Sequence, residues 1–433
     1  MRAPFLSLED LNTADPEQLA ASIAAADDEH HRLETEDKIE SQEFARLDEN
    51  IDNAHVVAAA LTETADRLET SYPEGVPEEV VASLEPVLEA LKNVVGFKPG
   101  SMKVSLEGLH GKERTRVAVE GLKETAKKIW EAIKAAFNRM IEFFKSIFTR
   151  QGRQRAAVEK KLDAALDAMK AGLGEHLDTR GGEEILYPLT CLVDGGKAAS
   201  LQQMTQWVRH DAQVLLETHA AAQDSFNSFY SLCVSEFSDI KTIEDVRKAE
   251  KMLAEWATKD TDKLVSRFGG DKKLKMSMGG YAAELITSVR KDYGSDQVMP
   301  LIQFEPKVPD IRNQVSDAVS GPMLELAKAE TLLNDVNRKV AQWPRDEDRE
   351  RMAAKVNELH KALADKSEHF PAGESVREAN ELPRLIKEAM RRLYAYVKIM
   401  YWSHDAAMSC FMGIIGVCAS SAVSNLKLNG VSV

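Results

Sequence analysis

Residues 122–148 read LKETAKKIWEAIKAAFNRMIEFFKSIF, and this stretch has the strongest helical pattern in the chain. Its apolar side chains recur at steps of three and four residues, the spacing that gathers them on one face of an α-helix. Residues 121–150 also hold seven lysines and arginines against three acidic residues. The pattern predicts a basic amphipathic helix. Such a helix either packs its apolar face into a helical bundle, the commoner use, or lies on an anionic membrane.

Helical spacing extends over most of the remaining chain of 433 residues. Ala, Leu, Glu and Lys are abundant and favour helices, and 44% hydrophobic with 29% charged residues is ordinary for a soluble protein with a core. We therefore predict an all-α fold, a long-helix bundle with an acidic helical arm at the N-terminus and the basic amphipathic helix after it. Further helices are expected over residues 16–70, 155–173, 201–236, 243–259, 311–342, 345–365 and 375–401.

Charge divides the chain near residue 107. The first 107 residues hold 24 acidic and 8 basic residues, a net charge of −16, whereas the whole chain has −14. The remainder is therefore nearly neutral, at +2. An acidic arm of this kind can solubilise the chain, shield a basic surface, or imitate a polyanion until it is removed.

The C-terminal segment between Asp405 and Lys427 contains no charged residue. Its 21 residues are enough to cross a bilayer, but they include four serines, two cysteines and Asn425. We interpret the segment as a buried hairpin partner of the helix around 394–402. A membrane-inserting segment over 406–423 is the alternative.

A hexapeptide repeat lies where the charge changes. Val104-Ser105-Leu106-Glu107-Gly108-Leu109 returns thirteen residues later as Val117-Ala118-Val119-Glu120-Gly121-Leu122. A small residue, any residue and Glu, followed by Gly, is the kind of short signal that a processing protease reads. Other tripeptides of this form, such as Ser41-Gln42-Glu43 and Ser83-Leu84-Glu85, lack the shared context and the Gly-rich surroundings that favour access. The repeat predicts a precursor that is cut after Glu107 or Glu120.

These patterns divide the chain into six segments. Residues 266–310 are the least regular, because they combine paired glycines with the basic run 272–275; within them 281–291 can be read as a helix and 298–304 as a short strand. The expected organisation is an acidic helical arm and candidate propeptide (1–107), a Gly-rich processing linker (108–120), the basic amphipathic helix (121–150), a helical bundle (151–265), an irregular connector (266–310), and a second helical bundle with the apolar C-terminal helix (311–433).

No motif points to catalysis or to a metal. A phosphate-binding loop, an HExxH zinc motif, an EF-hand loop and a nucleophile elbow are all absent from the sequence. Residues 27–31, Asp-Asp-Glu-His-His, fan out by about 100° each on a helix and cannot converge on one ion. Four cysteines without a CxxC pair fit a reducing compartment, and the N-terminus has no apolar signal-peptide core. We expect no enzymatic activity, no metal and no cofactor.

The repeat and the following KETAKKIWEAIK (residues 123–134) resemble the internal head proteins of large tailed bacteriophages. The resemblance covers residues 1–150 at most. It implies a virion protein of the capsid interior, made in the host bacterial cytoplasm, whose acidic propeptide the prohead maturation protease removes after a small-x-Glu site. Carried over to this chain, it makes Glu107 and Glu120 the residues before the cut bonds and Ser105 and Ala118 the small specificity residues. Leu106, Gly108, Val119 and Gly121 complete the two sites.

The implied partners are capsid or scaffold proteins, the prohead maturation protease, packaged DNA bound non-specifically, the host membrane, and further copies of the chain. Ejection with the DNA is part of the same expectation. A membrane-active helical protein, a pore former or ejection-channel component inserting through 122–148 and 406–423, is the alternative, and an uncut cytoplasmic coiled-coil adaptor is a third. Candidate membrane or partner contacts are Lys127, Lys128, Trp130, Lys134, Phe137 and Phe144.

Overall fold

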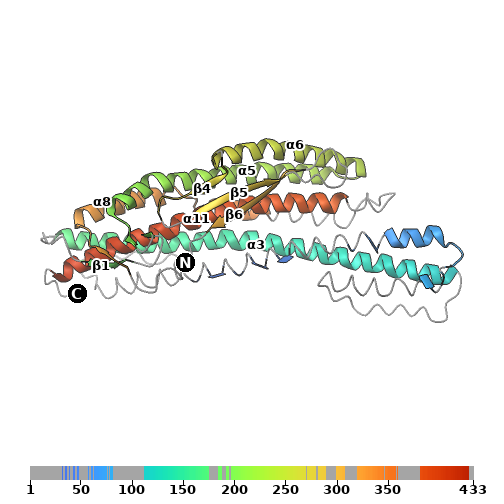
Figure 1. Cartoon of the computed structure of the whole chain (residues 1–433), viewed down its shortest axis with the longest axis horizontal. Coiled ribbons are helices and arrows are strands. Elements are labelled where there is room, and N and C mark those ends of the chain that lie inside the picture. The colour runs from blue at the N-terminus through green and yellow to red at the C-terminus, as the bar shows by residue number, and fades with distance from the viewer. Residues whose placement is uncertain are drawn as a thin grey trace.

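The longest element is a single helix, α3, that extends from Lys112 to Gly174. At 1.5 Å per residue its 63 residues span about 95 Å, and it runs along most of the length of the molecule (Figure 1). No proline interrupts this stretch, which is rich in Ala, Lys, Arg and Glu. The boundaries expected at residues 121 and 151 are therefore wrong as breaks, because one helix crosses both.

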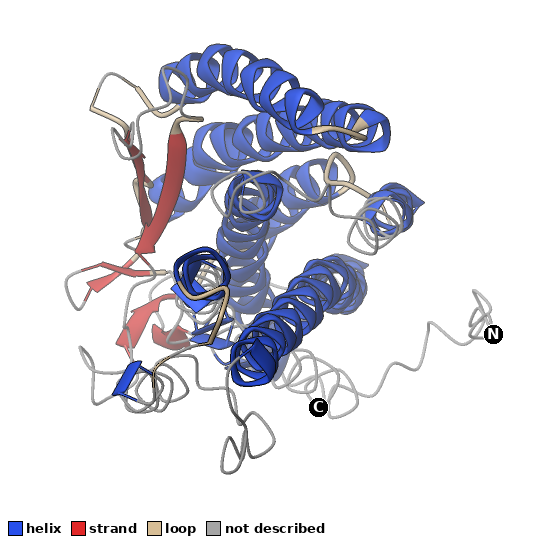
Figure 2. Cartoon of the chain, turned by 90° about the vertical axis from the view of Figure 1, so that its right-hand side faces the viewer, coloured by secondary structure: helices blue, strands red, loops and turns tan. Residues whose placement is uncertain are grey.

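The computed structural model describes residues 112–174, 184–187, 192–194, 197–269, 271–278, 281–288, 299–307, 319–345, 347–356, 358 and 381–428, together with scattered residues between 32 and 80. Helix predominates in this part of the chain, as the sequence predicts. The few strands are short and lie together on one side of the helices (Figure 2).

The second long helix, α11, extends from Glu381 to Leu428 and forms the centre of the core. Pro383 lies in its first turn, where a missing N–H breaks no helical bond. Because the helix is continuous, the predicted hairpin between 394–402 and the apolar segment is wrong, although the predicted burial is confirmed. α11 is long and apolar enough to cross a membrane, but most of it is enclosed by protein, as in the core helix of a soluble bundle.

Two cross-contacts set the direction of the long helices. Phe144 of α3 stacks on Tyr394 of α11 with ring centroids 6.0 Å apart. Ten residues further along α3, Gln154 donates a hydrogen bond to Asp405 of α11. α3 and α11 therefore run parallel, with residues near 250 positions apart side by side. In this register, the α3 residues before about 131 lie beyond the first residue of α11.

Shorter helices cover this pair. They are α4 (Leu201–Gln206), a π-helical turn (Trp207–Asp211), α5 (Ala212–Asp239), α6 (Ile243–Arg267) and α8 (Leu326–Val340). Ser200 and Thr242 cap α4 and α6 through reciprocal bonds with Gln203 and Asp245, which explains where both helices start. Residues 347–356 are also helical. The helix predicted over 311–342 is wrong at its start, because a strand occupies 319–322 and α8 begins at Leu326.

Part of the predicted irregular connector is a three-stranded antiparallel sheet, in the order β4 (Lys273–Lys275), β5 (Ala282–Ser288) and β6 (Leu301–Lys307). β5 replaces the helix read over 281–291, since Ala283 and Leu285 are buried while their neighbours are less so, which is a period of two. The short strand read near 298–304 is present as β6. Two further pairs join β1 (Glu184–Tyr187) to β7 (Val319–Pro322) and β2 (Val193–Asp194) to β3 (Lys197–Ala198).

Candidate functional site

The second copy of the repeat lies inside α3. Its Glu120 is exposed and stands 3.7 Å from Arg116, one helical turn earlier. Val119 and Leu122, on either side of the candidate bond, are buried at 6% and 3% exposure. The open linker predicted over 108–120 is thus wrong for residues 112–120, because the Gly-rich composition did not prevent the helix from starting at Lys112.

A protease binds its substrate in extended form, so cleavage after Glu120 requires the first turns of α3 to unwind. The bond lies about two and a half turns from the start of α3, and a helix frays most easily from its ends. The other candidate residues, Ser105, Leu106, Glu107 and Gly108, lie outside the described residues. For Ala118 the helical backbone is described, but its side chain is not.

Among the described residues, ion pairs join the acidic arm to α3 at three places. Lys112 Nζ lies 2.9 Å from Glu74 Oε1, Lys123 Nζ lies 2.8 Å from Glu69 Oε2 and 3.9 Å from Asp66 Oδ1, and Arg153 Nη2 lies 3.0 Å from Glu36 Oε2. As the residue number rises along α3 it falls along the arm. The described arm residues therefore run antiparallel to α3; the stretch 63–71 can be followed in blue beside the first turns of α3 in Figure 1.

Apolar side chains accompany these ion pairs. Five hydrophobic residues in the described part of the arm are buried, and they belong to the same core cluster as the α3 residues Val119, Leu122 and Ile129. The arm residues are Leu47, Val57, Leu61, Ala65 and Leu68. The helical periodicity that the sequence shows in the arm thus faces α3 and the core.

The candidate membrane or partner contacts have mixed positions. Phe144 is fully buried and stacks on Tyr394, so its predicted role as an external contact is wrong, and the helix is a core helix here. Lys127, Lys128, Trp130, Lys134 and Phe137 lie on the α3 backbone, but their side chains are outside the described part of the structure.

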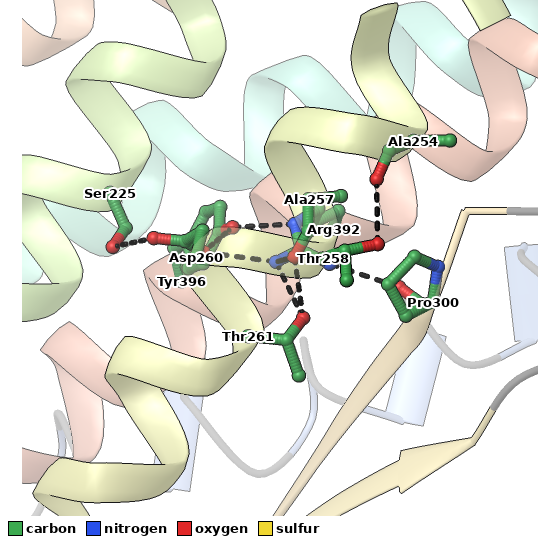
Figure 3. A network of polar contacts seen from close by, with 9 residues as sticks. All are labelled: Ser225, Ala254, Ala257, Thr258, Asp260, Thr261, Pro300, Arg392 and Tyr396. Carbon is green, nitrogen blue, oxygen red and sulfur yellow. Dashed lines mark hydrogen bonds and ion pairs between the residues drawn. The ribbon is translucent and has the colours of Figure 1, made fainter. Parts of the chain in front are cut away.

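Sequence reasoning missed a buried polar cluster around Arg392 of α11 (Figure 3). Its Nη2 donates to Asp260 Oδ2 at 2.9 Å and to Ala257 O at 2.8 Å, while Nη1 donates to Pro300 O at 2.9 Å. Ser225 Oγ donates to the second oxygen of Asp260 at 2.6 Å, and Tyr396 Oη donates to the first. The cluster joins α5, α6 and α11 to the segment before β6.

Every charge in this cluster is paired. Arg392 and Asp260 are 2% and 4% exposed, and burial raises the pKa of the Tyr396 phenol well above its usual value, so that it remains a donor. No spacing in the sequence could have revealed the cluster, because Asp260 and Arg392 stand 132 residues apart.

A second buried cluster joins α3 to α11. Gln154 Nε2 donates to Asp405 Oδ1 at 2.7 Å, and Gln154 Oε1 lies 3.2 Å from His404 Nδ1. The Trp343 ring stands between His404 and His219, with centroids 5.5 Å from each. Burial, and secondarily Arg349, lowers the pKa of His219 to about 3. His219 is therefore a neutral group of the core.

The structure thus consists of long parallel helices, an acidic arm on the first of them, and buried polar links between them. A sequence profile of phiKZ-like phage internal head proteins matches residues 25–283, more than half of the chain. The chain belongs to that family. No curated protein and no solved structure matches it.

The matched span of this internal head protein begins in the arm and ends inside β5, so it includes the described arm residues, α3, α5 and α6. Membership makes it a structural protein of the phage head that associates with the capsid, in the virion interior. This agrees with the resemblance seen in residues 1–150 and extends it by more than a hundred residues.

The cysteines in the described part of the internal head protein are enclosed. Cys233, Cys410 and Cys418 are buried, and burial raises the pKa values of the Cys233 and Cys418 thiols. Within the described ranges, no three His, Cys, Asp or Glu side chains are grouped so as to hold a metal ion.

Proposed function

We propose that this internal head protein is made as a precursor whose acidic arm the prohead maturation protease removes after Glu107 or Glu120. The observation that carries the proposal is the coincidence of the repeated small-x-Glu-Gly element with the change from a net charge of −16 to one of +2. A processing site at this boundary explains why the repeat and the charge change fall within the same twenty residues.

The role proposed for the cut protein is structural rather than enzymatic. Its long parallel helices, linked by buried polar clusters, form a rigid rod that remains in the capsid with the packaged DNA and is ejected with it. The arm assists entry into the prohead, where it contacts scaffold or capsid proteins before it is lost. The buried positions of Phe144 and of α11 give no support to the membrane-active alternative.

The two candidate bonds differ in what they require. Cleavage after Glu120 unwinds the start of α3 and removes residues 112–120 with the arm, whereas cleavage after Glu107 leaves all of α3 in the mature chain. In both cases the arm must leave the α3 surface that it covers through Leu61, Ala65 and Leu68.

The experiment is substitution of both glutamates in the phage gene. Glu107→Gln with Glu120→Gln removes both carboxylates and is expected to leave the arm attached in purified heads. The matched control is Glu43→Gln with Glu85→Gln, which alters two other small-x-Glu tripeptides in the arm. The intact mass of the protein from purified heads shows whether the arm is still attached. A shortened chain of the same mass in the double variant and in the parent would overturn the proposal.

A further inference from the structure

Basic charge is concentrated on α3. The helix holds 15 lysines and arginines against 8 aspartates and glutamates, a net charge of +7. Because the chain after residue 107 nets only +2, the part beyond α3 is slightly acidic, at −5. α3 is thus the element of the mature protein to which a polyanion would be attracted.

Two of the basic residues that pair with the arm lie in a line on α3. Lys112 and Lys123 stand eleven residues apart, which is close to three helical turns, so both project from the same side. Arg116 projects from nearly the same side and is exposed, at 69% of its side chain. This line adjoins the buried side that carries Val119 and Leu122.

The ion pairs between the arm and α3 are weak individually. Lys123, Asp66 and Glu69 are 47%, 49% and 61% exposed, and pairs of such exposure contribute little to stability. These pairs instead make the contact specific, because every described pair between the two segments has its base on α3 and its acid on the arm. The surface of α3 therefore favours an acidic partner. The arm presents to α3 a row of negative charges at intervals along a helical surface.

We propose that the α3 surface covered by the arm, from Lys112 and Lys123 to Arg153, binds the phosphate backbone of packaged duplex DNA in the mature protein, and that the acidic arm occupies this surface in the precursor. The inference rests on the proposed cleavage, and it adds the surface and the partner. Duplex DNA matches this basic surface chemically, because its phosphates are regularly spaced negative charges and it is packaged in the capsid, where the arm is removed. Cleavage after Glu120 removes Lys112 and Arg116, whereas Lys123 and Arg153 stay in the chain whichever bond is cut.

The first test uses the full-length precursor. Asp66→Asn, Glu69→Gln and Glu74→Gln together remove the acids that face Lys112 and Lys123. This arm variant is expected to bind a random-sequence duplex about tenfold more tightly at low salt. The control variant, Glu217→Gln with Glu325→Gln and Asp348→Asn, removes three acids paired with bases elsewhere on the body and equalises the net charge. Equal affinities of the two variants would overturn the proposal.

The second test measures the salt dependence in the arm variant. Adding Lys123→Gln and Arg153→Gln removes two phosphate contacts. The negative slope of log affinity against log salt should therefore become shallower by about 2. Arg247→Gln with Arg267→Gln on α6 is the matched control and should leave the slope unchanged. Vesicles of phosphatidylglycerol provide the other polyanion. Binding to the vesicles without binding to the duplex would contradict the assignment of DNA.

These results separate the two proposals. If the protein from heads is uncut, the proposed function fails, but the arm variant still decides whether the α3 surface binds DNA. If the protein is cut and the arm variant gains no affinity over the control, only the DNA surface fails.

Discussion

Arg392 Nη2 and Asp260 Oδ2 lie 2.9 Å apart in the interior, although 132 residues separate them in the sequence. Both side chains are almost completely buried. A buried charge that loses its partner keeps its desolvation penalty, so this pair fixes how α6 and α11 pack together.

Removing one member of the pair should therefore be costly. Asp260→Asn or Arg392→Met is expected to lower the free energy of unfolding by about 3–5 kcal/mol. Arg247→Ala is the control, because Arg247 also joins α6 to α11, through Glu381, but is half exposed; it should cost less than about 1 kcal/mol. Urea denaturation of the full chain measures both. Comparable losses for the buried and the exposed pair would refute this account of the core.

Phe144 tests whether the amphipathic helix is a core helix. Its ring is fully buried against Tyr394, so Phe144→Ala should destabilise the fold by about 3–5 kcal/mol. The adjacent Phe143 is only partly buried, and Phe143→Ala should cost clearly less. Thermal unfolding of the two variants compares them. Equal stability of Phe144→Ala and the parent would show that α3 uses this face for something else.

Gly321 permits a close approach between β7 and β1. A Cβ added there would lie 2.5 Å from Tyr187 Cε1 and 2.7 Å from Ala198 Cβ. Gly321→Ala should lower the free energy of unfolding by about 1–3 kcal/mol through overpacking. Ser320→Ala, at the exposed neighbouring position, is the control and should be nearly neutral. Denaturant midpoints distinguish the two, and a neutral Gly321→Ala would contradict the packing of this strand pair.

His219 predicts how stability depends on pH. The pKa of His219 in the folded chain is about 3, below the usual value of 6.5. Between these two pH values the unfolded chain binds a proton at His219 and the folded chain does not. Stability should fall as the pH drops below 6.5, by about 2 kcal/mol between pH 7 and pH 5 from this group. His219→Leu removes this contribution. Unfolding measured at both pH values should show a smaller loss in the variant, and identical losses would contradict the assignment.

The sequence predicted those features that depend on local spacing. The helical pattern of 122–148 and the apolar run after Asp405 both identified buried helices, because a one-sided or continuous apolar surface has to be covered. The sequence did not predict where helices end. The expected breaks at 121 and 151 were wrong, since glycine weakens a helix by only about 1 kcal/mol and tertiary packing can outweigh that. The hairpin expected before 406 was wrong as well, and residues 394–412 contain no glycine or proline that would interrupt a helix.

Long-range features could not be read from spacing. The β5 strand was taken as a helix because seven residues are too few to separate the two periods. The pairing of Arg392 with Asp260, and the docking of the arm on α3, depend on contacts between distant segments. Of the candidate processing site, the sequence identified the charge boundary and the repeated glutamates, but not that Glu120 lies in a helix.

Removal of the arm during head maturation can be tested by intact mass and N-terminal peptide mapping of the protein from purified heads. We expect a mature chain that begins at Gly108 or Gly121 and lacks the acidic residues that contact α3. A full-length chain beginning at Met1 or Arg2 would contradict it.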